Sequence, residues 1–122
     1  MLSQRLAALS QDQGGSFGPT FTWPLWEPIG GCEGSTIALR SGRLLFSGPS
    51  SRGLRVNMTV FESSDEGQTW KHVACIDPGP SAYSSLGELS DGDVGLLYER
   101  APPPPHIIFV PHAITFVLVP GL

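Results

Sequence analysis

The sequence predicts an all-β fold of short strands joined by tight turns, and three observations support this prediction. Glycine (15 residues) and proline (12 residues) make up over a fifth of the 122 residues, a composition that favours turns and disfavours long helices. Apolar and polar residues alternate over residues 54–62, as they do in a strand that buries one face. An eight-residue pattern starts at Ser10 and again at Ser63, and this 53-residue spacing is near the ~40–50 residues of one four-stranded propeller blade. We therefore expect a partial β-propeller of about two to three blades.

Each copy of the repeat has the residues needed to close a hairpin turn. The pattern, an Asp-box, reads Ser-x-Asp-x-Gly-x-Ser/Thr-aromatic. The aspartate side chain can accept hydrogen bonds from backbone N–H groups ahead of it, and the glycine adopts a positive φ without steric cost. The hydroxyl adds a local hydrogen bond, and the aromatic residue is expected to start the next strand and pack over the turn. A structural role is therefore assigned to Ser10, Asp12, Gly14, Ser16 and Phe17, and to Ser63, Asp65, Gly67, Thr69 and Trp70.

The remaining pattern predicts about eight strands and no helix. Residues 2–10 fit better as the strand before the first Asp-box than as a short helix. Along residues 54–62 the two expected faces are Leu54, Val56, Met58 and Val60 on one side, and Arg55, Asn57, Thr59 and Phe61 on the other. Further strands are expected at 35–39, 43–47, 70–76, 82–89 and 94–99, with hairpin turns at Ser41-Gly42 and Asp91-Gly92.

The C-terminal part of the chain has a different composition. Residues 101–105 contain four consecutive prolines, which cannot lie inside a sheet and are typical of a stiff, extended link. Residues 106–122 are apolar and weakly patterned, so a last pair of strands and an atypical tail are both consistent with them. The expected division is a propeller part over residues 1–100 and a proline-rich link with an apolar tail over residues 101–122.

Charge and hydropathy exclude several classes of function. The formal net charge is −4, and no basic patch suited to phosphates is visible, so we expect no nucleic-acid partner. The longest apolar stretch, residues 107–122, is interrupted by Pro111, His112 and Pro120 and is too short to span a bilayer. The first residues include no apolar core of a secretory signal, so none is expected in this chain.

Cysteine and histidine residues give no sign of a cofactor or metal. Cys32 and Cys75 permit one disulfide without requiring it, and free buried thiols are the expectation. The three histidines do not have the spacing of a ligand set, so no metal site is predicted at His72, His106 and His112.

Four segments narrow the class of propeller. They are residues 28–35 (Pro-Ile-Gly-Gly-Cys-Glu-Gly-Ser), residues 55–60 (Arg-Val-Asn-Met-Thr-Val), residues 79–86 (Gly-Pro-Ser-Ala-Tyr-Ser-Ser-Leu) and residues 97–99 (Leu-Tyr-Glu). In order and separation they resemble segments in the C-terminal half of the exo-α-sialidases (neuraminidases), which are six-bladed propellers. The sequences of residues 55–59 and 79–86 look most like those of the lysosomal type. The resemblance covers roughly Leu9 to Arg100, and the tail from Ala101 departs from it.

The resemblance implies roles for three residues. Tyr83 would be the nucleophile, because a neutral phenol is not repelled by the carboxylate that sialic acid carries on its anomeric carbon. Arg55 would be one of three arginines that hold this carboxylate. Glu99 would buttress a different arginine of the three by fixing its side-chain conformation. Taken singly, each residue is typical of an ordinary strand position, and it is the surrounding segments that favour the site roles.

The resemblance also implies groups that this chain does not contain. These are the acid/base aspartate, the glutamate that activates the nucleophile, and two of the three arginines. The expectation is therefore a glycosidase that removes terminal sialic acid from glycoproteins, glycolipids or oligosaccharides, without a cofactor, in which this chain alone has little or no activity. Cathepsin A as a partner and a lysosomal location are implied by resemblance only, with a cytoplasmic location as the alternative.

Two other interpretations stay open at this point. One is a non-catalytic fragment that binds glycans or proteins, and the other is an Asp-box propeller from outside the sialidases. Asn57 begins an Asn-Met-Thr sequon and is a candidate glycosylation site only if the protein enters the secretory route.

Overall fold

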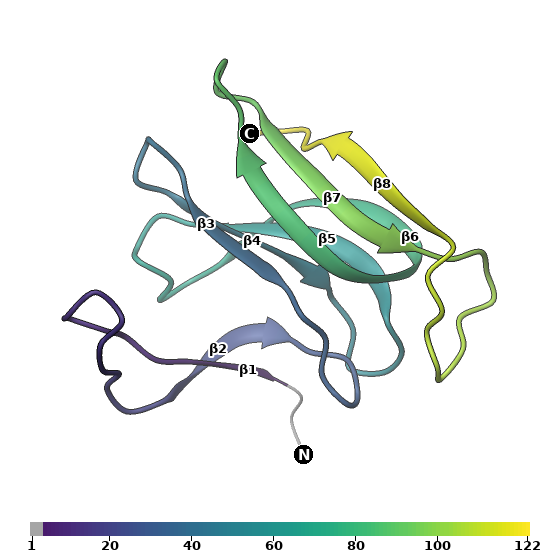
Figure 1. Ribbon diagram of the computed structural model, residues 1–122, viewed down its shortest axis with the longest axis horizontal. Helices are drawn as coiled ribbons and strands as arrows, with labels where there is room; N and C mark the ends of the chain where they lie inside the picture. The colour runs from purple at the N-terminus through teal and green to yellow at the C-terminus, as the bar shows by residue number, and fades with distance from the viewer. Residues whose placement is uncertain (1–3) are drawn as a thin grey trace.

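The computed structural model describes residues 4–122, and within this range it contains eight strands and no helix (Figure 1). The all-β prediction is confirmed. Of the strand expected over residues 2–10, residues 2 and 3 lie outside the described part. The strands are β1 (Gln4–Ala7), β2 (Phe21–Trp26), β3 (Ser35–Ala38), β4 (Leu44–Pro49), β5 (Val56–Ser63), β6 (Lys71–Glu88), β7 (Val94–Arg100) and β8 (Ala113–Leu118).

The strands form two antiparallel sheets. The first sheet contains only β1 and β2, and the second is a meander in the order β3-β4-β5-β6-β7-β8. The larger sheet curls, so that β3 and β4 come to lie near the second half of β6 (Figure 1). Its turns at Ser41-Gly42 and Asp91-Gly92 are where the sequence predicts them, and Gly42 and Gly92 both have positive φ.

Strand β6 belongs to two structural units at once. Its first half pairs with β5 as far as Val56 opposite Pro80, and its second half pairs with β7 from Ser81 opposite Arg100. The prediction of separate strands at 70–76 and 82–89 is therefore wrong. The Pro78-Gly79-Pro80 segment stays extended because proline, and the residue before it, disfavour helical backbone. The chain thus passes from one four-stranded unit, β3 to β6, directly into the next.

Strand β5 departs from the predicted alternation. Its backbone is irregular at Asn57, which has a positive φ of 63°, and the pairing with β6 shifts on both sides of Met58. As a result Met58, Thr59 and Val60 are all buried instead of alternating. Arg55 lies just before β5, in a turn closed by the Val56 N–H and the Leu54 carbonyl at 3.0 Å. Its direction is therefore set by this turn, and the strand alternation proposed from sequence is incorrect here.

The hydrophobic core lies inside the curl of the larger sheet. Leu45, Met58, Val60 and Leu96 are completely buried, and they come from both structural units that share β6. The core therefore fixes the two units relative to each other. Its other buried members are Leu39, Leu86, Val94, Tyr98 and Val119.

The C-terminal segment contributes one strand, and not a pair. β8 follows an irregular stretch over residues 101–112 and pairs with β7, for example Phe116 opposite Leu97. Val119 reaches the core, whereas Ile114, Phe116 and Leu118 project from the opposite face and are more than half exposed.

Both cysteines are free thiols. Cys32 is buried, as expected, but Cys75 is exposed, which corrects the expectation of two buried thiols. Cys75 lies on the part of β6 that pairs with β5, on a face that the core does not cover.

The two Asp-box turns have the same hydrogen bonds. In the second copy, the Asp65 carboxylate accepts the Thr69 N–H at 2.8 Å and both the Ser63 and Thr69 hydroxyls, while Ser63 Oγ accepts the Gly67 N–H at 2.8 Å. In the first copy, Asp12 accepts the Ser16 N–H at 2.8 Å and the Ser10 and Ser16 hydroxyls. The Thr69 and Ser16 hydroxyls are the main cause that lowers the pKa of Asp65 and of Asp12 to about 2.

The aromatic residues that end the two copies differ. Trp70 packs edge-on against Trp23, with ring centroids 5.1 Å apart, and its indole N–H donates to the Gly67 carbonyl at 3.1 Å. Phe17 is 66% exposed, and β2 begins only at Phe21. The expectation that the aromatic packs over its turn and starts the next strand is therefore wrong for Phe17. The second turn differs because Trp23 of β2 packs against its aromatic residue.

Replacing Asp65 with asparagine is expected to lower stability more than the same change at Asp12. The turn at Asp65 joins the central strands β5 and β6, whereas the turn at Asp12 joins only β1 and β2. Because the folded pKa of about 2 lies below the unfolded value of ~3.9, the ionised carboxylate stabilises the fold above ~pH 4, and this contribution is lost as pH falls toward 2.

Urea denaturation followed by tryptophan fluorescence between pH 2 and 7 measures both effects. Asp65→Asn should flatten the loss of stability between pH 4 and pH 2, and Asp12→Asn serves as the matched control. Equal effects of the two substitutions on the global transition would contradict the unequal weight given to the two turns.

Candidate functional site

Arg55, Tyr83 and Glu99 come together although they lie on three different elements. The Arg55 guanidinium carbon lies 5.2 Å from the centroid of the Tyr83 ring, within the range of a cation–π contact. The Tyr83 N–H donates to Glu99 Oε2 at 3.3 Å. The sequence-predicted site residues therefore form one cluster, to which the turn before β5, the second half of β6 and the end of β7 each contribute one member.

Arg55 keeps its positive charge available for a bound anion. Its Nη2 donates to the Gly31 carbonyl at 2.9 Å, which fixes the side chain without neutralising it. Within residues 4–122 it makes no ion pair, whereas Arg5, Arg40, Arg43 and Arg100 each pair with a carboxylate. The remaining arginine, Arg52, stacks on the Trp26 ring at 3.7 Å. Arg55 is thus the half-buried arginine best placed to bind a carboxylate from outside the chain.

The glycine-rich segment places the carbonyl that holds Arg55. Gly30 and Gly31 have φ of 83° and 80°, a conformation that favours glycine over residues with a Cβ. The next residue, Cys32, donates its N–H to Glu27 Oε1 at 3.0 Å. This segment resembles a sialidase sequence, but its role in orienting Arg55 was not predicted because no sequence spacing joins it to residue 55.

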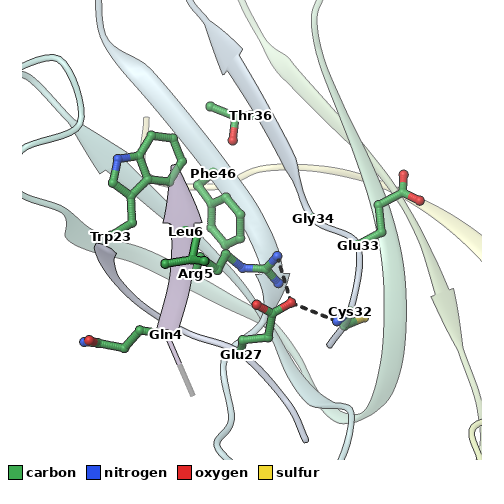
Figure 2. Close-up of a pocket in the computed structure, with 10 residues that line it drawn as sticks. All are labelled: Gln4, Arg5, Leu6, Trp23, Glu27, Cys32, Glu33, Gly34, Thr36 and Phe46. Carbon is green, nitrogen blue, oxygen red and sulfur yellow. Dashed lines mark hydrogen bonds and ion pairs between the residues drawn. The ribbon is translucent and has the colours of Figure 1, made fainter. Parts of the chain in front are cut away.

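Glu27 connects this segment to the N-terminal sheet, as Figure 2 shows. The Arg5 guanidinium lies 3.5 Å from Glu27 and 4.7 Å from the centroid of the Phe46 ring. Burial lowers the pKa of Arg5, while Glu27 acts in the opposite direction. These residues border a pocket of about 670 Å³ that also contains Glu33 at its exposed rim (Figure 2). Neither Arg5 nor Glu27 belongs to a recognisable motif, so the sequence predicts no role for these two residues.

Tyr83 faces outward because its neighbours are anchored inward. Its side chain is 44% exposed, whereas Ala82 and Ser84 on either side are buried. Ser84 Oγ lies 2.8 Å from Ser47 Oγ and donates to the Ser47 carbonyl at 3.2 Å, which ties β6 to β4. The pairing of β6 with β7 is irregular between Ser81 and Ser84, a type of distortion that often redirects a side chain at a functional site.

The second tyrosine has a contrasting environment. Tyr98 is buried and donates its hydroxyl to Asp77 Oδ2 at 3.0 Å, and Asp77 is also 3.5 Å from Arg100. Burial, and then the bond to Asp77, raise the pKa of Tyr98. Tyr98 is therefore part of the core, and it supports the end of β7 from which Glu99 projects.

Other sequence candidates lie apart from this cluster or have no partner in it. Asn57 is half-buried with a positive φ, so the structure gives it a backbone role in the β5 irregularity. No cluster of metal-ligand side chains occurs in residues 4–122, and no helix there is long and apolar enough to cross a membrane.

Comparisons with known proteins agree with this description. No family model matches the chain. It is 37% identical over 103 residues to a sialidase of Micromonospora viridifaciens and 26% identical over 138 residues to mouse Sialidase-3, each alignment covering 78% of this chain. The chain spans only 16% and 33% of the length of these two relatives. Its structure is similar to the intramolecular trans-sialidase from Ruminococcus gnavus, with a TM-score of 0.65 at 23% identity, over 80% of this chain and 24% of that one.

The fold, its repeated Asp-turn hairpins and these structural neighbours define the chain as part of a β-propeller. Within that class, the sequence relatives identify it as a fragment of the sialidase family. The comparisons do not separate the lysosomal type from other sialidases, so that assignment stays a prediction.

Replacing Ser84 with alanine is expected to cost about 1–3 kcal/mol of stability, because it leaves the buried Ser47 hydroxyl without its partner. Ser85, the exposed neighbour, provides the matched control, and Ser85→Ala is expected to change stability by less than about 0.5 kcal/mol. Urea denaturation of the two variants measures the difference. Equal values would show that the Ser47–Ser84 contact does not hold β6 against β4.

Proposed function

We propose that the chain supplies part of the active site of an exo-α-sialidase, an enzyme that hydrolyses terminal sialic acid from glycoconjugates with retention of configuration. The observation that carries the proposal is the contact between the Tyr83 ring and an arginine, Arg55, without a carboxylate partner among the described residues. A phenol beside an available guanidinium suits a sugar that bears a carboxylate next to its reacting carbon.

In this proposal Arg55 binds the sugar carboxylate and Tyr83 attacks the anomeric carbon. The planar guanidinium can donate two parallel hydrogen bonds to a carboxylate, and the Gly31 carbonyl occupies only one of its donor groups. The Tyr83 oxygen forms a bond to the anomeric carbon as the glycosidic bond breaks, and the phenol proton passes to a carboxylate from another part of the site. Water later cleaves the bond between the tyrosine and the sugar, and the phenol regains its proton. An acid outside this chain would protonate the leaving oxygen.

Glu99 has the role of a positioning residue in this scheme. Its carboxylate accepts the Tyr83 N–H, so it helps to fix the backbone of the nucleophile. Its other oxygen remains available for an arginine supplied by the absent part of the site. The family resemblance assigns Glu99 as the buttress of an arginine. The hydrogen bond from the Tyr83 N–H adds a second role, in which Glu99 positions the backbone of the nucleophile.

The chain alone is expected to be inactive. A phenol that keeps its proton is a poor nucleophile, and the carboxylate that would remove this proton is not among the assigned residues. The sialidase relatives are several times longer than this chain, which agrees with a site completed by other blades. A lysosomal setting and a cathepsin A partner extend this proposal and rest on resemblance alone.

Hydrolysis of a fluorogenic sialoside tests the proposal, with this chain compared to a version extended by upstream sialidase blades. The extended protein should be active, and Tyr83→Phe should reduce kcat by at least about a hundredfold because it removes the attacking oxygen. Tyr98→Phe is the matched control, since it removes a phenol that Asp77 binds in the core. An extended, folded protein that is active and indifferent to Tyr83→Phe would remove the assignment of the nucleophile.

A second candidate function is a non-catalytic interaction module. The observation that favours it is the exposed apolar face of β8, formed by Ile114, Phe116 and Leu118. Glycan binding without hydrolysis in the extended protein would support this alternative.

A further inference from the structure

A second pocket lies directly beside the candidate carboxylate-binding arginine. It has a volume of about 450 Å³ and is bordered by Ile29, Leu54, Arg55, Ile107, Ile108 and Phe109. Among the described residues that line it, Arg55 is the only charged one. The pocket therefore combines one cation with an otherwise apolar wall.

The apolar residues of this wall are unusually exposed. Ile29, Ile107 and Ile108 are 77%, 92% and 79% exposed, although isoleucine is among the residues most often buried. Exposed apolar groups gathered around one concave site are typical of a ligand-binding surface. Scattered single residues would carry no such meaning, but these three border the same pocket.

The walls of the pocket are tied to the site by the backbone. The Ile29 N–H donates to the Gly53 carbonyl at 2.9 Å, which joins the glycine-rich segment to the turn that carries Arg55. Arg55 in turn binds the Gly31 carbonyl. The third wall, residues 107–109, comes from the tail that departs from the sialidase resemblance.

We infer that this pocket binds an apolar group attached to a carboxylate-bearing ligand, with the carboxylate on Arg55 and the apolar group against Ile29, Ile107 and Ile108. The charge of Arg55 favours the anionic carboxylate of the ligand. The isoleucine side chains disfavour a charged group elsewhere on the ligand, because they offer it no hydrogen bonds. The inference rests on the proposed function in naming the ligand: it deepens the substrate class to sialosides that carry an alkyl or aryl substituent.

Titration of the isotope-labelled chain with methyl and hexyl sialosides, followed by NMR, tests the inference. The hexyl compound should bind roughly tenfold more tightly or better, because a few of its methylene groups leave water. Its added shifts should map to residues 29–30, 53–55 and 107–109. Ile108→Ser should remove the gain from the hexyl group while the affinity for the methyl sialoside stays unchanged.

Two controls make the result specific. Ile114→Ser changes an isoleucine that is 73% exposed on β8, outside the pocket, and should leave both affinities unchanged. Hexyl glucoside lacks the carboxylate and should bind at least tenfold more weakly than hexyl sialoside. Ile107→Ser provides a second variant if Ile108→Ser disturbs the spectrum of the free protein.

The outcomes separate this inference from the proposed function. Equal affinities of the two sialosides, both lost in Arg55→Met, would overturn the apolar subsite and leave the sialidase proposal standing. Binding of hexanoate but of neither sialoside would support the amphiphilic pocket and count against sialic acid as the ligand. Shifts confined to residues 113–118 would overturn the inference, since they would place the hexyl group on β8.

Discussion

The unbroken backbone of β6 is the constraint on which the arrangement of this protein depends. One strand of 18 residues pairs with β5 in its first half and with β7 in its second, so the two structural units cannot move independently. The buried contact between Ser47 and Ser84 and the shared core hold the second half of β6 beneath β4. Arg55 and Tyr83 belong to different units, and they meet only because this strand carries the chain from one unit to the other.

The part of the fold that the sequence predicts is the part governed by local chemistry. The hydrogen bonds of the Asp65 turn all lie within residues 63–69, and the hairpins at Gly42 and Gly92 need only a local positive φ. The cluster of Arg55, Tyr83 and Glu99 was also predictable, but through resemblance of whole segments and not through any property of the single residues. In both cases the relevant information lies within a short stretch of sequence.

The errors arise where distant contacts decide the local structure. Pro78 and Pro80 look like the end of a strand, yet β6 continues because partners on both sides accept an extended backbone. The irregularity at Asn57 cannot be read from an alternating pattern, because it depends on the register with β6. The roles of Glu27 and of the Gly31 carbonyl could not be predicted for the same reason. The Gly31 carbonyl binds Arg55, and Glu27 binds the adjacent Cys32 N–H, only because the fold brings these loops together.

The exposed edge of strand β8 affects how the molecule can associate with other chains. It stands at the edge of the larger sheet, and the sequence contains no aspartate, glutamate, lysine or arginine after Arg100. Natural edge strands commonly use such charges to repel an incoming strand. Ile114, Phe116 and Leu118 face outward, and no charged side chain on β8 repels an approaching strand. The backbone groups on the outer side of β8 can therefore pair with a strand of another chain. A further strand paired with β8 would extend the sheet, so the isolated chain is expected to associate through this edge.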